Sequence, residues 1–274
     1  MIDLYTWYTS NGRKVSIALE ELGLPYRVHP IDIRRGVQHE AAFRALNANA
    51  KIPVIIDRET GVVLSESGAI LLYLADKAGS LMPAEPSARW KATEWLMWQM
   101  GGLGPVLGQH LHFNHYRRGV SPYAGDRFGD EAARLFTVLD ARLADEPFLA
   151  GEYSMADIAV WPWIARYPRA GIDLGDYPNV EHWYTGVAKR PAVQRGWRVP
   201  RNAEEMPMPQ AASLPSVLGP SAMMRATPRA TETTRATAHP TAHPTAQATA
   251  QATAQATVHA TDTTRVTATT EVRA

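Results

Sequence analysis

A short polar segment near the start of the chain has the residue types needed to hold an anion. The sequence Thr-Ser-Asn-Gly at 9–12 follows an alternating run at 2–6 and precedes apolar residues at helical spacing, so it joins an expected strand to an expected helix. Backbone N–H groups and the dipole at a helix N-terminus favour negative charge, including that of a thiolate. The structural alternative is a helix cap with an Asn-Gly turn, and the segment alone leaves both interpretations open.

A second polar segment, Glu66-Ser67-Gly68, also precedes a run with helical spacing. Ser67 could cap this helix while the first N–H groups hold a carboxylate, and Glu66 could accept a hydrogen bond from an ammonium group. Together the two residues suit an amino-acid zwitterion. The simpler alternative is a helix cap next to a surface acid.

The sequence contains no cysteine, which excludes disulfides, thiolate metal sites and a protein-borne sulfur nucleophile from these residues. Any thiol chemistry must therefore use a small-molecule thiol. Three histidines, His110, His112 and His115, are close in sequence, but only the last two face one side of a helix, and no nearby acid completes a set of ligands. We therefore predict no metal site.

The elements around the two polar segments predict an α/β domain over residues 1–80. Period-two and helical spacings alternate, which predicts strands at 2–6, 26–33, 52–56 and 62–64 and helices near 15–22, 40–46 and 67–75. This order gives a small mixed sheet with helices on both faces. Ile52-Pro53 opens the third strand, where a proline marks a turn, a sheet edge or a cis peptide.

Residues 87–205 predict a second, helical domain. Apolar residues recur at helical spacing over the ranges 88–100, 123–143, 157–165 and 180–189. Ser154 at an N-cap and Asp157 three residues later form a capping box, which is a folding signal and not a catalytic pair. The run Gly-Gly-Leu-Gly-Pro at 101–105 interrupts a helical stretch and permits either a kink or close helix packing.

Composition changes abruptly at residue 206. Residues 206–274 contain no aromatic side chain and repeat Ala, Thr, Pro and Gln, which predicts a disordered low-complexity tail. The chain carries a net charge of only +1, which argues against a nucleic-acid or membrane-surface partner. No stretch approaches the ~18 apolar residues of a membrane span, and the start does not resemble a signal peptide. We therefore expect a cytoplasmic protein.

These motifs, in this order, resemble those of the glutathione transferases over residues 1–200. The shared motifs are Lys-Ile-Pro-Val at 51–54, Glu-Ser-Gly-Ala-Ile at 66–70 and Ser-Met-Ala-Asp at 154–157. Within that superfamily, Thr-x-Asn-Gly at 9–12 and Trp-Gln-Met-Gly-Gly-Leu-Gly-Pro at 98–105 are similar to the nu class and to the bacterial glutathione-dependent disulfide-bond oxidoreductases. The resemblance implies a thioredoxin-like α/β domain followed by an all-α bundle, and a homodimer.

The resemblance also implies which residues lie near the sulfur of glutathione. Thr9 and Asn11 would be the catalytic pair. Tyr5, Tyr8 and Ser10 carry competing hydroxyl groups, and Ser10 stands where the related oxidoreductases have proline.

Further residues would bind glutathione along its length. Pro53 would follow a cis peptide, so that the backbone of Ile52 pairs with the cysteinyl part of glutathione as an added strand does. Glu66 and Ser67 would hold the γ-glutamyl end. The remaining implied contacts are Gln38 and Lys51 at the glycyl end and Arg127 across a dimer interface.

The implied reaction is thiol–disulfide exchange, with glutathione as co-substrate and no metal. A bound glutathione thiolate would attack a small disulfide, and a second glutathione would resolve the mixed disulfide. Conjugation of glutathione to an electrophile is an alternative, which needs a wider hydrophobic pocket beside the thiol. A non-catalytic binding protein that keeps the fold is a second alternative.

Overall fold

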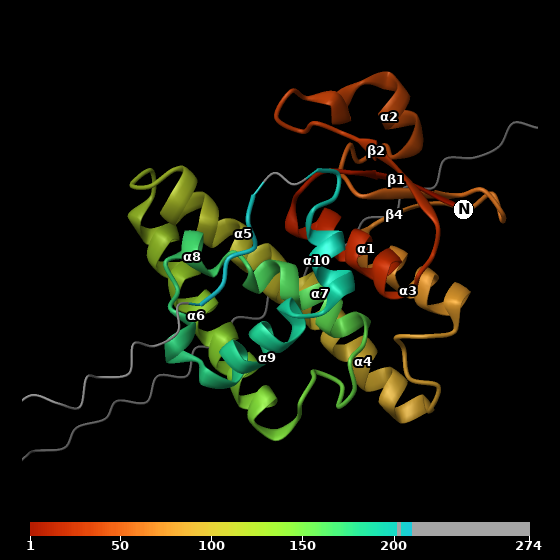
Figure 1. Cartoon of the computed structure of the whole chain (residues 1–274). Coiled ribbons are helices and arrows are strands. Elements are labelled where there is room, and N and C mark those ends of the chain that lie inside the picture. Colours follow the sequence, from red (N-terminus) through yellow and green to blue (C-terminus); the bar gives the residue numbers. More distant parts are fainter. Residues whose placement is uncertain (202–203, 210–274) are drawn as a thin grey trace, which may run out of the picture. The chain divides into compact units, whose positions relative to one another are not determined.

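The computed structural model describes residues 1–201 and 204–209, which belong to one unit extending from Met1 to Val217. The predicted tail at 206–274 lies outside the described residues except for 206–209. The described residues form an N-terminal α/β part and a C-terminal helical part, so the predicted fold class is confirmed (Figure 1). Within these residues, no helix is both long and apolar enough to span a bilayer.

The α/β part contains a four-stranded mixed sheet in the order β2-β1-β3-β4. Strand β1 (Ile2–Thr6) pairs in parallel with β2 (Tyr26–Pro30) and antiparallel with β3 (Val54–Asp57), which pairs antiparallel with β4 (Val63–Ser65). All four predicted strands form. Strand β2 is shorter than the predicted range of 26–33, because Asp32 accepts a hydrogen bond from the Arg34 N–H (3.0 Å) and starts a turn.

Helices cover both faces of the sheet, as predicted. Val54 packs with Ile31 and Phe43 on one face, whereas its neighbour Ile55 joins Leu4 in the main core on the other. This alternation follows from the two-residue period of a strand. The first face is covered by η1 (Val37–His39) and α2 (Ala41–Leu46), and the second by α1 (Ser10–Glu21) and α3 (Ser67–Ala78).

The helical part is a series of helices joined by short connections. They are α4 (Pro86–Trp98), the π-helix η2 (Gln99–Leu103), α5 (Gly104–Leu111), the π-helix η3 (His112–Tyr116), α6 (Pro122–Asp145), α7 (Met155–Ile164), α8 (Tyr167–Ala170), the 3-10 helix η4 (Leu174–Asp176), α9 (Pro178–Ala188) and α10 (Pro191–Trp197). The four predicted helical ranges correspond to α4, α6, α7 and α9. The shorter α5, α8 and α10 were not predicted, because so few residues do not establish a helical period.

Helix α7 lies at the centre of the helical part and is buried at every position except Trp163. The predicted capping box at its start is confirmed: Ser154 Oγ accepts from the Ala156 N–H (3.3 Å), and Asp157 accepts from the Ser154 N–H (3.0 Å). Asp157 also accepts from Trp183 Nε1 (2.9 Å). Burial raises the pKa of Asp157 to about 6, although these donors act in the opposite direction.

The glycine-rich run at 101–105 contains a π-helical turn and one close contact. The backbone continues from α4 through η2 into α5 without leaving helical geometry. A Cβ added to Gly104 would lie 2.5 Å from Gln99 Nε2, whereas one added to Gly101 or Gly102 would meet no atom within 4 Å. The absence of a side chain at Gly104 therefore leaves room for Gln99, which is buried.

Helix α1 connects the two parts of the structure, because it packs against α3, α7 and α10 (Figure 1). Its contact with α10 is especially close: a Cβ added to Gly196 would lie 2.6 Å from the Ile17 Cα, and Ser16 Oγ donates to the Gly196 carbonyl (2.7 Å). This close contact between α1 and α10 fixes the position of α1, and with it the residues at the start of the helix.

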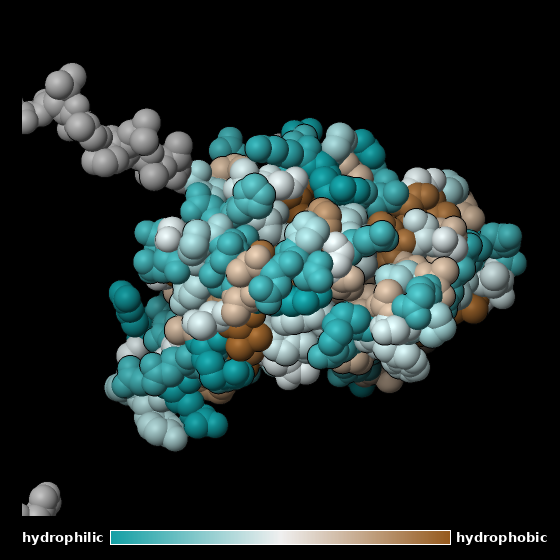
Figure 2. All heavy atoms as spheres, turned by 90° about the horizontal axis from the view of Figure 1, so that it is seen from below, coloured by the Kyte–Doolittle hydropathy of each residue, from teal (hydrophilic) through white to brown (hydrophobic). Residues whose placement is uncertain are grey.

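On the face drawn in Figure 2, hydrophilic residues predominate and hydrophobic residues form small separate clusters.

Candidate active site

Thr9 is the N-cap of α1. Its Oγ1 accepts a hydrogen bond from the Gly12 N–H (3.1 Å), which confirms the predicted cap. The predicted Asn-Gly turn does not form, because Asn11 and Gly12 both lie in the first turn of α1. The cap uses only an acceptor position of the hydroxyl, so its O–H remains able to donate to a ligand.

Asn11 is oriented by a residue from the other part of the structure. Trp163 Nε1, on α7, donates to Asn11 Oδ1 (3.0 Å). Because this contact occupies the amide oxygen, the amide NH2 group is left as the donor side of Asn11. Asn11 is half-buried and lines a cavity, so this donor suits a negatively charged ligand atom.

The start of α3 differs from the predicted cap. Ser67 is the first residue of α3 and not its cap, since the N-cap position is occupied by Glu66, and no side chain of the described residues caps this helix end. Glu66 has φ 67°, a conformation that costs a non-glycine residue about 1–3 kcal/mol and often marks a functional site. The first N–H groups of α3 therefore keep their capacity for an anion.

Lys14 is buried next to this helix end, and no sequence motif pointed to it. Its Nζ donates to Ser67 Oγ (3.3 Å), to Gln99 Oε1 and to Met100 Sδ (3.3 Å). None of these three partners carries a charge. Burial lowers the pKa of Lys14 to about 7, and the nearby Glu66 carboxylate opposes this shift. An anion at the start of α3 would therefore gain an electrostatic partner.

One cavity of about 140 Å³ brings together most of the predicted glutathione-binding residues. It is lined by Asn11, Asn47, Lys51, Ile52, Pro53, Glu66 and Ser67. The predicted cis peptide between Ile52 and Pro53 is confirmed. Asn47 was not predicted; its Nδ2 donates to the Lys51 carbonyl (2.8 Å) and so fixes the loop that precedes the cis peptide. The arrangement places an uncapped helix end, a backbone segment and a lysine around one small cavity.

Two predicted residues lie outside this cavity. Gln38 is in η1, where its Nε2 contacts His39 Nε2 (3.2 Å). Arg127 is exposed on α6 and lines a separate cavity of about 670 Å³. Their roles in binding glutathione stay predictions.

A second cavity, of about 430 Å³, lies at the start of α1, where Thr9 lines it. Its walls combine aromatic and cationic side chains, among them Trp7, Tyr8, Trp163 and Arg166. The start of α1 therefore borders both cavities: Asn11 faces the smaller one and Thr9 the larger one. A sulfur atom held at this helix end would be accessible to a second molecule in the larger cavity.

Two of the three competing residues, Tyr8 and Ser10, line the same cavity as Thr9. Ser10 Oγ accepts from Arg166 Nε (3.1 Å). The Tyr5 ring stacks on His29, with ring centroids 4.5 Å apart, while Tyr8 packs against Trp7. Among the described residues, no three His, Asp or Glu side chains are grouped as metal ligands. The assignment of Thr9 and Asn11 as the catalytic pair stays a prediction.

Comparison with known proteins supports the family resemblance. Residues 9–77 match the model of the glutathione S-transferase N-terminal domain, and residues 122–186 match that of the C-terminal domain. Escherichia coli YfcG, named a disulfide-bond oxidoreductase, is 46% identical over 199 residues, which are 70% of this chain and 93% of YfcG. Escherichia coli YghU, also named a disulfide-bond oxidoreductase, is 41% identical over 212 residues, which are 71% of this chain and 73% of YghU.

Solved structures with bound ligands have the same fold. A glutathione transferase from Pseudomonas putida, with one glutathione disulfide bound per subunit, is 40% identical with a TM-score of 0.70, covering 73% of this chain and 91% of that chain. One from Burkholderia graminis, with two glutathione molecules per subunit, is 41% identical with a TM-score of 0.69, covering 73% and 89%. Both family models and the extent of these matches show that the chain belongs to the glutathione S-transferase family.

Proposed function

We propose that this protein is a glutathione-dependent disulfide-bond oxidoreductase in which Thr9 and Asn11 stabilise the glutathione thiolate. The observation that carries the proposal is the junction of two cavities at the start of α1, where Asn11 is oriented with its amide NH2 as donor. The names of the similar YfcG and YghU support the same activity. The lack of cysteine fits a reaction in which the only nucleophilic sulfur is that of the substrate.

Two hydrogen bonds are sufficient to activate the thiol. A free thiol has a pKa near ~8.5, and lowering it by two units requires about 2.7 kcal/mol. Each hydrogen bond to a charged acceptor contributes about 1.5–3 kcal/mol, and the helix N-terminus adds about 0.3–1 kcal/mol. The Thr9 hydroxyl, the Asn11 amide and the α1 dipole therefore account for the required stabilisation.

The reaction proceeds by two exchanges. In the first, the glutathione thiolate forms a bond to one sulfur of the disulfide, whose S–S bond breaks and releases a thiolate. In the second, another glutathione thiolate attacks the mixed disulfide, which yields glutathione disulfide and a second released thiolate. The disulfide is reduced by two electrons and two glutathione molecules are oxidised, so no further reductant is needed.

In this proposal, residues 1–80 form the glutathione-binding domain and residues 87–205 the helical domain. The γ-glutamyl carboxylate binds at the start of α3 beside Ser67, and the Ile52 backbone binds the cysteinyl part. Lys51 and Gln38 bind the glycyl carboxylate. Arg127 reaches the ligand of the partner subunit in a homodimer located in the cytoplasm. The uncapped start of α3 and the buried Lys14 amine next to it support an orientation in which the γ-glutamyl end of bound glutathione lies at α3.

Substitution of the two donors tests the site. We expect Thr9→Ala and Asn11→Ala each to lower kcat/KM for glutathione-dependent reduction of 2-hydroxyethyl disulfide by about tenfold or more, the effect of losing one hydrogen bond to a charged group. Asn11→Asp should be more damaging than Asn11→Ala, because a carboxylate repels the thiolate. Thr137→Ala is the matched control, since Thr137 is exposed on α6 and only donates to the Ala133 carbonyl (3.1 Å).

Full activity of both alanine variants and of the double variant would refute the assignment of Thr9 and Asn11. Circular dichroism and the binding of S-methylglutathione, which has no thiol, should be unchanged in the variants, so that a loss of activity reports on the thiolate. Assaying an aryl halide with the same preparations separates disulfide reduction from conjugation. Tight glutathione binding without turnover of either substrate would instead identify a binding protein.

A further inference from the structure

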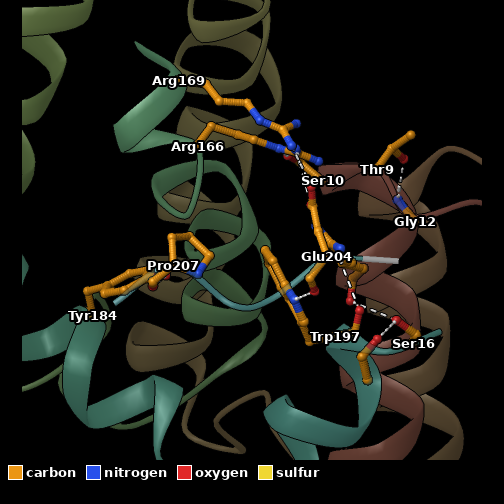
Figure 3. A network of polar contacts seen from close by, with 12 residues as sticks. Thr9, Ser10, Gly12, Ser16, Arg166, Arg169, Tyr184, Trp197, Glu204 and Pro207 are labelled. Carbon is orange, nitrogen blue, oxygen red and sulfur yellow. Dashed lines mark hydrogen bonds and ion pairs between the residues drawn. The ribbon is translucent and has the colours of Figure 1, made fainter. Parts of the chain in front are cut away.

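Three arginine side chains converge on one carboxylate beside the larger cavity. Glu204 Oε1 contacts Arg13 Nη1 (2.6 Å) and Arg166 Nη1 (3.4 Å), and Glu204 Oε2 contacts Arg169 Nη2 (2.6 Å). Figure 3 shows Arg166 and Arg169 extending toward Glu204 from the neighbourhood of α8. Arg13 comes from α1 and approaches the same carboxylate. Residues from three separate parts of the chain thus form one ionic cluster.

The cluster contains more positive than negative charge. Three guanidinium groups share the single Glu204 carboxylate. The Arg13 side chain is fully buried, stacks 3.3 Å from the centroid of the Trp197 ring, and its Nη2 has no hydrogen-bond partner among the described residues. Burial lowers the pKa of Arg13 to about 10 and also lowers that of Arg166. A cluster with surplus cationic donors can accept a further anion or exchange Glu204 for another one.

The cluster is connected directly to the predicted reaction site. Arg166, Arg169 and Glu204 line the same cavity as Thr9. Arg166 Nε also donates to Ser10 Oγ, which lies between Thr9 and Asn11 in the chain. A fourth arginine, Arg34, lines this cavity as well. A disulfide placed for attack from the start of α1 would therefore have its substituents beside these arginines and beside Glu204.

Glu204 reaches the cluster on a segment without helix or strand. The described residues 204–209 follow α10, and two backbone contacts hold them: Trp197 Nε1 donates to the Glu204 carbonyl (3.0 Å), and Tyr184 Oη donates to the Pro207 carbonyl (2.6 Å) (Figure 3). Neither contact involves the Glu204 carboxylate. The negative charge can therefore be removed by substitution while the backbone anchors of the segment are kept.

We propose that the Glu204 carboxylate occupies a subsite for an anionic group of the second substrate and thereby sets the selectivity between neutral and carboxylate-bearing disulfides. This inference rests on the proposed disulfide reduction. A carboxylate on the disulfide must compete with Glu204 for Arg166 and Arg169, whereas a neutral disulfide does not. Glu204 thus acts as a specificity-determining residue that does not take part in the exchange itself.

The test compares two disulfides of similar length under the same low-salt conditions. We measure kcat/KM for the neutral 2-hydroxyethyl disulfide and for the dianionic 3,3′-dithiodipropionate with the full chain and with Glu204→Gln. The amide keeps the shape of the side chain and removes its charge. We expect the ratio of dianionic to neutral kcat/KM to rise about tenfold, because one nearby repulsive charge is lost. The rise should shrink in 0.5 M salt.

Glu205→Gln is the matched control. Glu205 is the exposed neighbour of Glu204 and lines a different cavity, so its substitution should leave the ratio unchanged. An unchanged ratio in Glu204→Gln, or an equal rise in Glu205→Gln, would overturn the proposal.

A second variant tests the subsite if Glu204→Gln does not fold. Arg169 has a side chain that is 43% exposed, so Arg169→Gln should be tolerated, and we expect it to lower the same ratio severalfold. A ratio that does not fall contradicts an anionic subsite.

If the unmodified protein reduces neither disulfide, the proposed function fails, and the subsite is then judged by calorimetry. Glu204→Gln must then bind 3,3′-dithiodipropionate more tightly than the unmodified chain does.

Discussion

Replacing Lys14 by methionine should remove a large pH dependence from the stability of this protein. The Lys14 side chain is buried and its three hydrogen-bond partners are neutral. Its pKa is lowered from 10.5 to about 7, chiefly by burial. Methionine has a similar length and no titratable group, so Lys14→Met keeps the volume of the side chain and eliminates the proton equilibrium.

The sign and size of the effect follow from proton linkage. Between pH 7 and 10.5 the unfolded chain keeps the proton on Lys14, whereas the folded protein has largely released it, so the free energy of unfolding rises with pH. Integrating the difference in bound protons between pKa values of 10.5 and about 7, at 1.36 kcal/mol per unit, gives an increase of about 3.5 kcal/mol from pH 7 to pH 10. The lost hydrogen bonds to Ser67 and Gln99 cost about 1 kcal/mol each, but this cost does not vary with pH.

The assay is urea unfolding of the unmodified chain and of Lys14→Met at pH 7 and at pH 10. The difference in unfolding free energy between the two proteins should shift by about 3.5 kcal/mol in favour of the unmodified chain as the pH rises. Other titrating groups are common to both proteins and cancel. The same difference at both pH values would show that Lys14 is not desolvated in the folded state and would refute the reasoning.

Two further predictions concern helix α1 and its contacts. Binding of S-methylglutathione at pH 8 should be accompanied by uptake of up to about one proton per subunit, because the proposed carboxylate beside Ser67 favours the charged form of Lys14; calorimetry in phosphate and in Tris measures this uptake, which should disappear in Lys14→Met. Gly196→Ala should destabilise the fold by about 1–3 kcal/mol, since the added Cβ would lie 2.6 Å from the Ile17 Cα. Gly186→Ala, where no atom lies within 4 Å, is its control, and equal melting temperatures for the two variants would contradict the close α1–α10 contact.

Local sequence patterns determined much of the architecture. The strand β1, the N-cap at Thr9 and the capping box of Ser154 and Asp157 depend on residues within a few positions of one another, so their signals are visible in a short window. The family motifs extended this reading to Ile52 and its cis peptide. These motifs also predicted most residues of the smaller cavity, because they are short and contiguous.

Only the tertiary structure decided how the site residues are oriented and charged. The donor side of Asn11 depends on Trp163, which is 152 positions away in the chain. A pairing between such distant residues produces no periodic pattern in the sequence around either of them. The predicted cap at Ser67 was wrong because a buried lysine from α1 contacts its hydroxyl, while Glu66 takes the N-cap position. Three arginines around Glu204 likewise meet only after the helices have packed. Sequence determined most of the elements and the caps at Thr9 and Ser154, whereas packing between distant segments set the burial, and hence the charge and hydrogen-bond direction, of the groups that do chemistry.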